Sequence, residues 1–382
     1  MLNRRDADAL VLLDRGDILS LYLNVDPAQP ENQSAPPAYR IWVKNALDEV
    51  TEGADREQRR VLREVATRVR EYVNLYRPRG KGLALFAGPD FWREFTLPVP
   101  VLNHVHFGQP DVAPLLWLLD EYKPYGIVLV DRVQARFLAA FLGRAAFQGE
   151  SRLVLDTTDW RRMDLKPATG HGIYVKGSNR DAFDARVDEQ IASFWRSVAE
   201  QVTSWAEQEG FRQLVIGGEE EAVAEVLRLL PEETARLVAG KVNMFASASE
   251  SEVLERVEPV VLAFERQREL SLVDRVLDGA LSGGQAAIGL ADVLGVLQEG
   301  RAHVVVVAWP FEGTAYQCFD CGYLLVQRQP HCPFCSGALT VRPLRELLPR
   351  LAYEKKTGLE LVSEAAAERL AVCDGIAALL RY

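Results

Sequence analysis

The spacing of the cysteines is the strongest constraint that this sequence places on its own structure. Four of the five cysteines form two C-x2-C pairs separated by ten residues, namely Cys318, Cys321, Cys332 and Cys335. Each pair presents two thiolates on one side of a tight loop, and a glycine follows each pair, at Gly322 and Gly337. Two such loops facing each other complete a tetrahedral all-sulfur site. The pattern predicts a structural Zn²⁺ ion in a zinc-ribbon knuckle at 317–339.

A full shell of four thiolates leaves no open position for water or substrate, which favours a structural over a catalytic metal. His331 is adjacent to Cys332, but four sulfurs suffice, so we expect it to face solvent. In a chain of this size that is expected to be cytoplasmic, clustered C-x2-C pairs indicate metal rather than disulfides. The fifth cysteine, Cys373, lies in an apolar segment and is expected to be a buried small residue.

Length and composition indicate a globular protein of two or three domains. The chain has 382 residues, of which 48% are hydrophobic and 26% charged. No apolar run approaches the ~20 residues of a membrane span, and charges interrupt the N-terminus, so we expect a cytoplasmic protein. The net charge of −10 argues against broad contact with nucleic acid, although a local basic patch is compatible with it. Acidity that serves only solubility is the alternative.

Hydrophobic patterns predict alternating strands and helices, which indicates an α/β fold. We expect strands at 18–25, 82–87, 126–131, 134–142, 151–156, 214–216 and 303–309, and helices at 39–76, 183–208, 251–281 and 344–354. Gly217 and Gly218 are expected to form a turn before a helix, where a phosphate could bind. Glu219 to Glu221 favour the alternative, because three carboxylates in a first helical turn repel an anion.

The C-terminal eight residues, GIAALLRY (Gly375–Tyr382), resemble the end of the third domain of archaeal and eukaryotic class-1 release factors and of Pelota, their ribosome-rescue relative. Four further segments are similar to the same family: 81–88, 120–131, 287–307 and 351–362. The chain thus resembles the bacterial branch of this family, discontinuously and over nearly its whole length.

The resemblance implies three domains. Residues 1–120 correspond to an N-terminal α/β domain in the codon-reading position of release factors. Residues 121–262 correspond to an RNase-H-like central domain that carries the catalytic loop, here 166–181. Residues 263–382 correspond to a C-terminal αβα domain related to kink-turn-binding ribosomal proteins, with the zinc knuckle 317–339 inserted.

Release factors hydrolyse peptidyl-tRNA with a GGQ loop, whose glutamine helps to position a water. This chain has GGQ at Gly283-Gly284-Gln285, but in the third domain, where glycine serves ordinary turns. The resemblance instead aligns Gly177-Ser178-Asn179 with the catalytic tripeptide. Asparagine keeps the hydrogen-bonding groups of glutamine, but its reach is shorter by roughly 1 Å. Whether hydrolysis is retained therefore stays open.

The same loop holds three basic residues that are candidates for contact with rRNA phosphates: Lys166, Lys176 and Arg180. Solvated loop charges are the alternative. His171 could act as a general base, although a histidine between two glycines with no neighbouring acid is more often an ordinary loop residue. The NIKS-type tip with which release factors read stop codons is absent from the first domain.

These features predict a ribosome-binding translation factor that acts in rescue, termination-like or hibernation processes without reading stop codons. Its expected partners are rRNA, peptidyl-tRNA and a translational GTPase, with no membrane contact and a monomeric state. Two alternatives stay open: an active peptidyl-tRNA hydrolase on stalled ribosomes, and an RNA- or protein-binding module that works away from the ribosome.

Overall fold

The computed structural model describes residues 2–156 and 178–382, and only the backbone of 178–183. It divides into two compact units, one formed by 1–122 together with 265–382 and the other by 123–264. Sheets with covering helices occur in both units, which confirms a mixed α/β fold of several parts.

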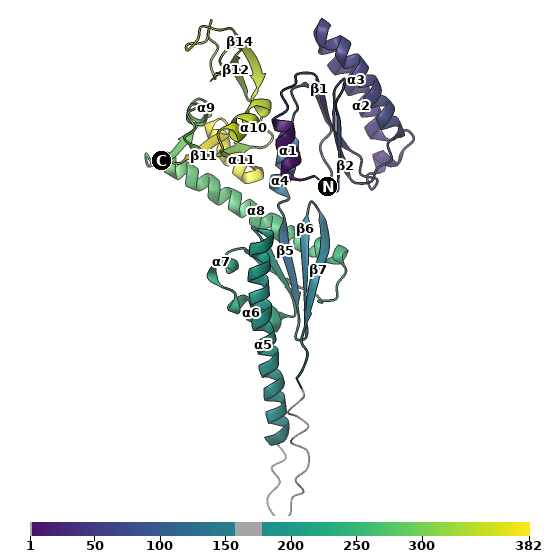
Figure 1. Cartoon of the computed structure of the whole chain (residues 1–382), viewed down its shortest axis with the longest axis vertical. Helices are drawn as coiled ribbons and strands as arrows, with labels where there is room; N and C mark the ends of the chain where they lie inside the picture. Colours follow the sequence, from purple (N-terminus) through teal and green to yellow (C-terminus); the bar gives the residue numbers. More distant parts are fainter. Residues whose placement is uncertain (1, 157–177) are drawn as a thin grey trace, which may run out of the picture. The chain divides into compact units, whose positions relative to one another are not determined.

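The N-terminal part of the first unit is built on an antiparallel sheet of order β3-β2-β1-β4. Its strands are β1 (Ile18–Asn24), β2 (Gly82–Ala87), β3 (Trp92–Leu97) and β4 (His104–Gly108). Helices α2 (Ala38–Gly53) and α3 (Arg56–Leu75) cover one face of it (Figure 1). Leu19, Leu21 and Leu23 alternate along β1 toward these helices, as the two-residue period of a strand requires.

The helical stretch predicted at about 39–76 is confirmed, but it is divided into two helices. Helix α2 ends at Gly53, and Asp55 then caps α3 by accepting the amides of Glu57 and Gln58 at 3.0 and 2.8 Å. An aspartate N-cap satisfies amides that have no partner within the helix, and so it starts a new helix here. The remaining elements of this part are α1 (Arg4–Val11), η1 (Pro30–Gln33) and α4 (Ala113–Glu121).

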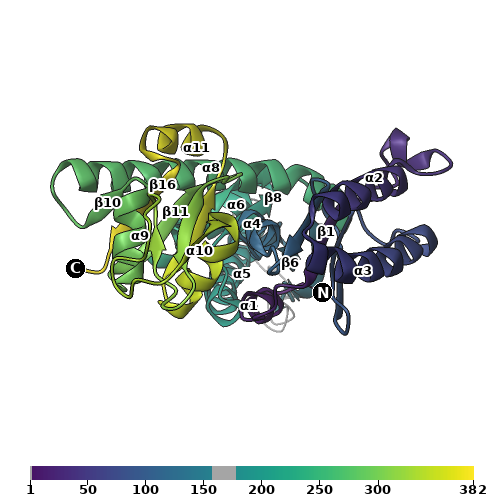
Figure 2. The same ribbon diagram turned by 90° about the horizontal axis from the view of Figure 1, so that it is seen from above.

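The C-terminal part of the first unit has a sheet of order β10-β16-β11-β15. Its strands are β10 (Ala286–Ile288), β11 (Ala302–Ala308), β15 (Gly358–Val362) and β16 (Ile376–Leu380), and only β11 and β15 pair in parallel. Helices α8 (Glu250–Leu281) and α11 (Glu364–Leu370) lie on one side of the sheet, with α9 (Leu290–Gln298) and α10 (Leu344–Glu354) on the other (Figure 2).

The apolar C-terminal segment supplies an inner strand of this sheet. Ile376, Ala377 and Ala378 of β16 are fully buried between β10 and β11. Cys373 lies in the short 3₁₀ helix η3 (Ala371–Cys373) and is buried, as predicted. The tail that carries the family resemblance is therefore core structure.

The second unit has a five-stranded sheet of order β7-β6-β5-β8-β9. Strands β5 (Tyr125–Val130), β8 (Leu214–Gly218) and β9 (Val238–Asn243) are parallel, whereas β6 (Gln134–Phe141) is antiparallel to β5 and to β7 (Arg144–Arg152). Its other elements are α5 (Ser178–Glu209), α6 (Glu220–Leu229) and α7 (Glu232–Ala235).

Two predictions for this unit are wrong. The third strand is not 151–156 but Arg144–Arg152, because Leu142 and Gly143 have φ values of 49° and 66° and turn the chain straight back after β6. Gly217 and Gly218 end β8 rather than forming a turn. A Cβ on Gly218 would lie 1.8 Å from the Val130 carbonyl oxygen, so glycine is required by close packing of two strands.

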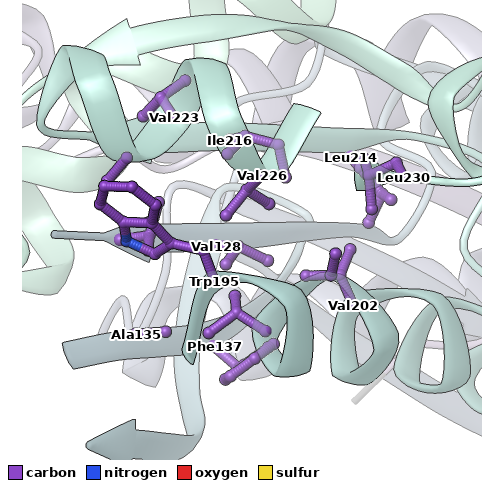
Figure 3. Packing of buried hydrophobic residues seen from close by; sticks show 14 of the residues in the cluster. Val128, Ala135, Phe137, Trp195, Val202, Leu214, Ile216, Val223, Val226 and Leu230 are labelled. Atoms are coloured by element: carbon purple, nitrogen blue, oxygen red, sulfur yellow. The ribbon is translucent and has the colours of Figure 1, made fainter. Parts of the chain in front are cut away.

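Figure 3 shows how α5 and α6 close the core of this unit over the sheet. Val128 and Ile216 from neighbouring strands meet Val202 of α5 and Val226 of α6, and all four are fully buried. Burial of each such side chain contributes about 1.5–3 kcal/mol. The indole Nε1 of Trp195 donates to the Asp131 carbonyl oxygen at 3.0 Å. Helix α5 is thus firmly anchored, which matters because the candidate loop leads into it.

Candidate functional site

The four clustered cysteines lie at one end of a small three-stranded sheet. Its order is β13-β12-β14, with β12 (Thr314–Cys318) antiparallel to both β13 (Leu324–Leu325) and β14 (Leu339–Pro343). The first cysteine pair follows the central strand β12, and the second pair precedes β14. Pairing of these two strands places Cys318 opposite Leu339 and so brings the two loops together.

The two C-x2-C loops have the same backbone hydrogen bonds. The amide of Cys318 donates to the Tyr323 carbonyl and its carbonyl accepts from Gly322, at 2.9 and 3.0 Å. The amide of Cys332 donates to the Gly337 carbonyl and its carbonyl accepts from Ser336, both at 2.9 Å. The chain therefore forms two matched knuckles, as the repeated spacing predicts.

The glycines that follow the pairs serve different purposes. Gly322 has a φ of 74° and makes the left-handed turn of the first knuckle. In the second knuckle Ser336 takes this position with a φ of 60°. Gly337 is instead needed for space, because a Cβ there would lie 2.2 Å from an Asp320 carboxylate oxygen and 3.0 Å from the Cys318 sulfur.

The predicted ligand atoms converge on one point. All four sulfurs lie within 4.8 Å of one another. The Sγ–Sγ distances are 3.3 Å for Cys318 and Cys335 and 3.6 Å for Cys321 and Cys332. Zn–S bonds of ~2.3 Å in a tetrahedron separate the sulfurs by about 3.8 Å. The donor set and its spacing therefore fit a tetrahedral thiolate metal site.

Backbone amides also favour thiolate at these positions. The amide of Cys321 donates to the Cys318 sulfur and is the main reason that the pKa of this thiol falls to about 7. The Gly337 amide has the same effect on Cys335, but neighbouring sulfurs, first that of Cys318, outweigh it and raise the pKa of Cys335 to about 12. Four thiolates this close repel one another, so only a bound cation makes full ionisation favourable.

The candidate loop is described only where it enters α5. Lys166, His171, Lys176 and Gly177 lie outside the described residues. The backbones of Ser178, Asn179 and Arg180 form the start of α5. This helix is held further along by the buried residues Phe194, Trp195, Val198 and Val202. Ser178 and Asn179 are thus the first two residues of a helix that the core anchors.

The GGQ sequence at 283–285 has an ordinary structural role. It follows the C-terminus of α8, where Gly283 has a φ of 68°. The Gly284 amide donates to the Gly279 carbonyl at 2.7 Å, and the Gly283 amide donates to the Ala280 carbonyl at 3.3 Å. This pair of bonds is a Schellman motif, which ends helices and favours glycine at the left-handed position. The two glycines are therefore explained by helix capping.

Sequence reasoning missed a buried polar cluster between β4 and α10. Asp111 is fully buried and accepts hydrogen bonds from Arg345 and from His104, the latter at 2.9 Å. His106 lies 3.1 Å from Glu346. Burial alone would raise the pKa of Asp111, but the His104 hydrogen bond and the Arg345 charge lower it. In the sequence, His104 and His106 are two residues apart and Arg345 and Glu346 are adjacent. This spacing does not indicate a cluster unless β4 is already known to face α10.

A family model matches the central part of the chain. Residues 110–261 match the bacterial archaeo-eukaryotic release factor family 10. The matched region includes the loop 166–181 and α5. This match confirms the resemblance to the bacterial branch of the release factor and Pelota family. A search of curated proteins gave no match.

Solved structures similar to this chain come from the same group of factors. Archaeal translation termination factor aRF1 is 16% identical, with 100% of this chain and 99% of that chain covered and a TM-score of 0.28. Pelota of Archaeoglobus fulgidus is 17% identical, with coverages of 80% and 81% and a TM-score of 0.36. Dom34 of S. cerevisiae is 11% identical, with coverages of 81% and 76% and a TM-score of 0.43. Since these TM-scores are below 0.5, the resemblance to this family rests on the match of residues 110–261.

Among the helices that the structure describes, none combines the length and the apolar character needed to cross a bilayer.

Proposed function

We propose that this chain, which matches the bacterial archaeo-eukaryotic release factor family 10 over residues 110–261, is a ribosome-binding translation factor. It acts without reading stop codons, in ribosome rescue, termination-like or hibernation processes. The observation that carries the proposal is the family match over a central region in which Gly177-Ser178-Asn179 replaces the catalytic tripeptide. The first domain also lacks the codon-reading tip, which favours a Pelota-like mode over termination at a stop codon.

The three-domain division at 1–120, 121–262 and 263–382 belongs to this proposal. Three separate main sheets, one within each segment, support it. The strand order β7-β6-β5-β8-β9, with β6 alone antiparallel, supports an RNase-H-like central domain. In this proposal the third domain is an αβα layer related to kink-turn-binding ribosomal proteins.

The metal of the cysteine site is proposed to be a structural Zn²⁺ ion. Cys318, Cys321, Cys332 and Cys335 hold it, and the full thiolate shell keeps it out of the chemistry of the loop. The ion holds the two knuckles together, and the ribbon then forms a small projecting surface of the third domain. Metal binding and folding of the ribbon are accordingly one process.

The proposed partners follow from the family. Lys166, Lys176 and Arg180 contact rRNA phosphates, and the tripeptide 177–179 faces peptidyl-tRNA. A translational GTPase delivers the protein, which acts as a monomer in the cytoplasm. Because the whole chain is acidic, we expect ribosome binding to depend on this local basic group and to weaken with salt.

Co-sedimentation tests ribosome binding. Purified protein should pellet with vacant or stalled ribosomes at physiological salt and stay in the supernatant without them. If it pelleted with neither ribosomal state, the proposal would fail, and the alternative of an RNA- or protein-binding module away from the ribosome would be favoured.

The second candidate function is peptidyl-tRNA hydrolysis. It is favoured by Asn179, whose carboxamide has the chemistry of the replaced glutamine and whose backbone starts the anchored helix α5. Release of labelled peptide from stalled complexes measures this activity. If the tripeptide carries out hydrolysis, Asn179→Ala should abolish peptide release. Equal release by the wild-type chain and by Asn179→Ala would show that Asn179 does not have this role.

A further inference from the structure

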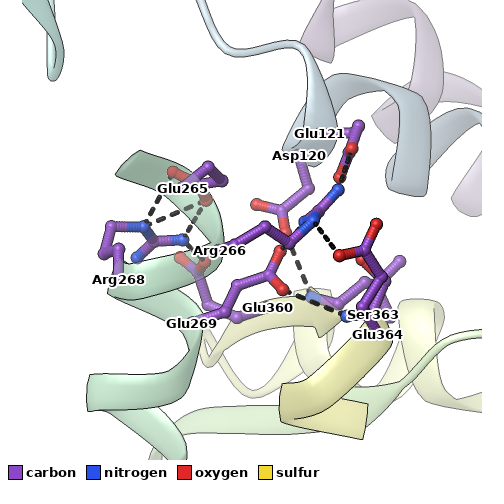
Figure 4. Close-up of polar contacts among 10 residues, drawn as sticks. Asp120, Glu121, Glu265, Arg266, Arg268, Glu269, Glu360, Ser363 and Glu364 are labelled. Carbon is purple, nitrogen blue, oxygen red and sulfur yellow. Dashed lines mark hydrogen bonds and ion pairs between the residues drawn. The ribbon is translucent and has the colours of Figure 1, made fainter. Parts of the chain in front are cut away.

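The chain crosses between the two units twice, and we call these two crossings the outgoing and the returning passage. At both crossings the end that belongs to the first unit lies in a cluster of ionic side chains. It leaves the first unit after Tyr122, directly behind the end of α4 at Glu121. It re-enters at Glu265, within α8. Figure 4 shows that residues from these two points meet each other and the segment from β15 to α11.

Arg266 joins the two passages directly. Its guanidinium forms an ion pair with Glu121 at the end of α4. It also contacts Glu269 one turn along α8 at 2.6 Å, and Glu364 of α11 at 3.5 Å. Glu121 and Glu269 are almost fully shielded from solvent, with 8% and 2% of their side chains exposed. The arginine therefore sits among three carboxylates from three elements.

Further contacts join the ends of both passages to β15 and to the residues that follow it. Arg268 pairs with Glu265 and with Glu360 of β15, both at 2.6 Å. Asp120 accepts the Leu361 amide at 3.1 Å, and Glu269 accepts the Ser363 amide, also at 3.1 Å. Two carboxylates from the two passages thus bind backbone amides of one short segment. Removal of a partner from such a buried group leaves an unpaired charge, which is strongly unfavourable.

We propose that these residues form an ionic clamp that locks the end of α4 to α8 and to the segment from β15 to α11, so that the chain leaves and re-enters the first unit at two points fixed to each other. The clamp consists of Asp120, Glu121, Glu265, Arg266, Arg268, Glu269, Glu360 and Glu364. This inference does not depend on ribosome binding, because it concerns only how the chain is connected.

The balance of charges makes the clamp sensitive to pH. Six carboxylates, on α4, α8, β15 and α11, surround two arginines. Burial raises the pKa of Glu269 to about 7, and the Glu121 and Glu265 charges act in the same direction against the Ser363 amide and Arg266. A carboxyl whose pKa rises on folding favours the folded state while it is protonated. The contribution of Glu269 to the stability of the clamp is therefore fully present below about pH 4.5 and is lost as pH rises through about 7.

Hydrogen exchange of the full chain tests the clamp at Leu361 and Ser363, whose amides it binds. Arg266→Gln should raise exchange there and at the end of α4 by about tenfold or more, since it leaves the buried carboxylates of Glu121 and Glu269 without their cation. Arg369→Gln is the matched control, because Arg369 pairs with Asp274 between the same two helices but on an exposed surface. It should leave these amides unchanged. Equal exchange in wild type and Arg266→Gln would overturn the proposal.

A second measurement needs no destabilising variant. After correction for the intrinsic exchange rates, opening at Leu361 and Ser363 in the wild-type chain should increase as pH rises from about 4.5 to about 7. Glu269→Gln, which keeps the shape and removes the titrating proton, should abolish that increase. The proposal is wrong if both proteins show the same pH dependence, even if Arg266→Gln fails to fold.

Discussion

The cysteine ribbon and the ionic clamp hold the chain together in opposite ways. The metal site proposed for the ribbon takes all its ligands from two short loops, at Cys318–Cys321 and Cys332–Cys335, and depends on an ion that the chain does not supply. The clamp draws its charges from positions between Asp120 and Glu364 and supplies every partner itself. Local spacing reveals the first kind of site, whereas the second exists only once distant elements have packed. The predictions below test this difference.

Metal removal should have the largest effect and should be confined to the ribbon. A chelator, or Cys332→Ser, is expected to remove about 10 kcal/mol of metal-coupled folding energy and to release protection of the amides in β12–β14. Metal analysis and hydrogen exchange measure this effect, with one Zn²⁺ per chain expected. Cys373→Ser is the control, because that cysteine is buried away from the cluster and should keep the ion. Loss of protection in β5 or β11 would contradict a local role.

Loss of a clamp arginine should have a smaller but less local effect. Arg266→Gln is expected to lower the free energy of unfolding of the first unit by about 3 kcal/mol, because it leaves Glu121 and Glu269 without their cation. Urea unfolding measures this change. Arg369→Gln, which removes the exposed ion pair with Asp274, should lower the free energy of unfolding by less than about 0.5 kcal/mol. Similar losses in both variants would mean that the clamp is an ordinary surface network.

Substitutions in the GGQ sequence at 283–285 should have the smallest effect on stability and no effect on peptide release. Gly283→Ala is expected to cost about 1 kcal/mol, because alanine resists the left-handed conformation of the helix cap. Gln285→Ala should change stability by less than about 0.5 kcal/mol and leave peptide release as it is in wild type. A loss of release in Gln285→Ala would show that this tripeptide, and not 177–179, carries the chemistry.

Much of the local structure could be predicted from sequence. The strand Gly82–Ala87 and the helix Leu344–Glu354 have the predicted bounds, because short apolar runs and amphipathic patterns specify them. The matched knuckles follow from the cysteine spacing. The break between α2 and α3 was missed because the apolar period continues across it, although Asp55 is a recognisable N-cap.

The clamp and the β4–α10 cluster could not be predicted. Glu121, Arg266 and Glu269 resemble solvated helix charges in sequence, and only the packing of α4 against β15 and α8 buries them. Asp111 is similarly inconspicuous until Arg345, more than two hundred residues away, reaches it. Such charges become functional or structural through partners that no local pattern identifies.

Ribosome co-sedimentation of the wild-type chain beside a variant that lacks Gly177–Asn179 tests the central claim most directly. The account predicts that wild type pellets with vacant or stalled ribosomes at physiological salt. Removal of the tripeptide should weaken binding without abolishing it, because the proposed binding also uses Lys166, Lys176 and Arg180, which this variant keeps. Recovery of the wild-type chain entirely in the supernatant, with the zinc site loaded and the protein folded, would contradict the account.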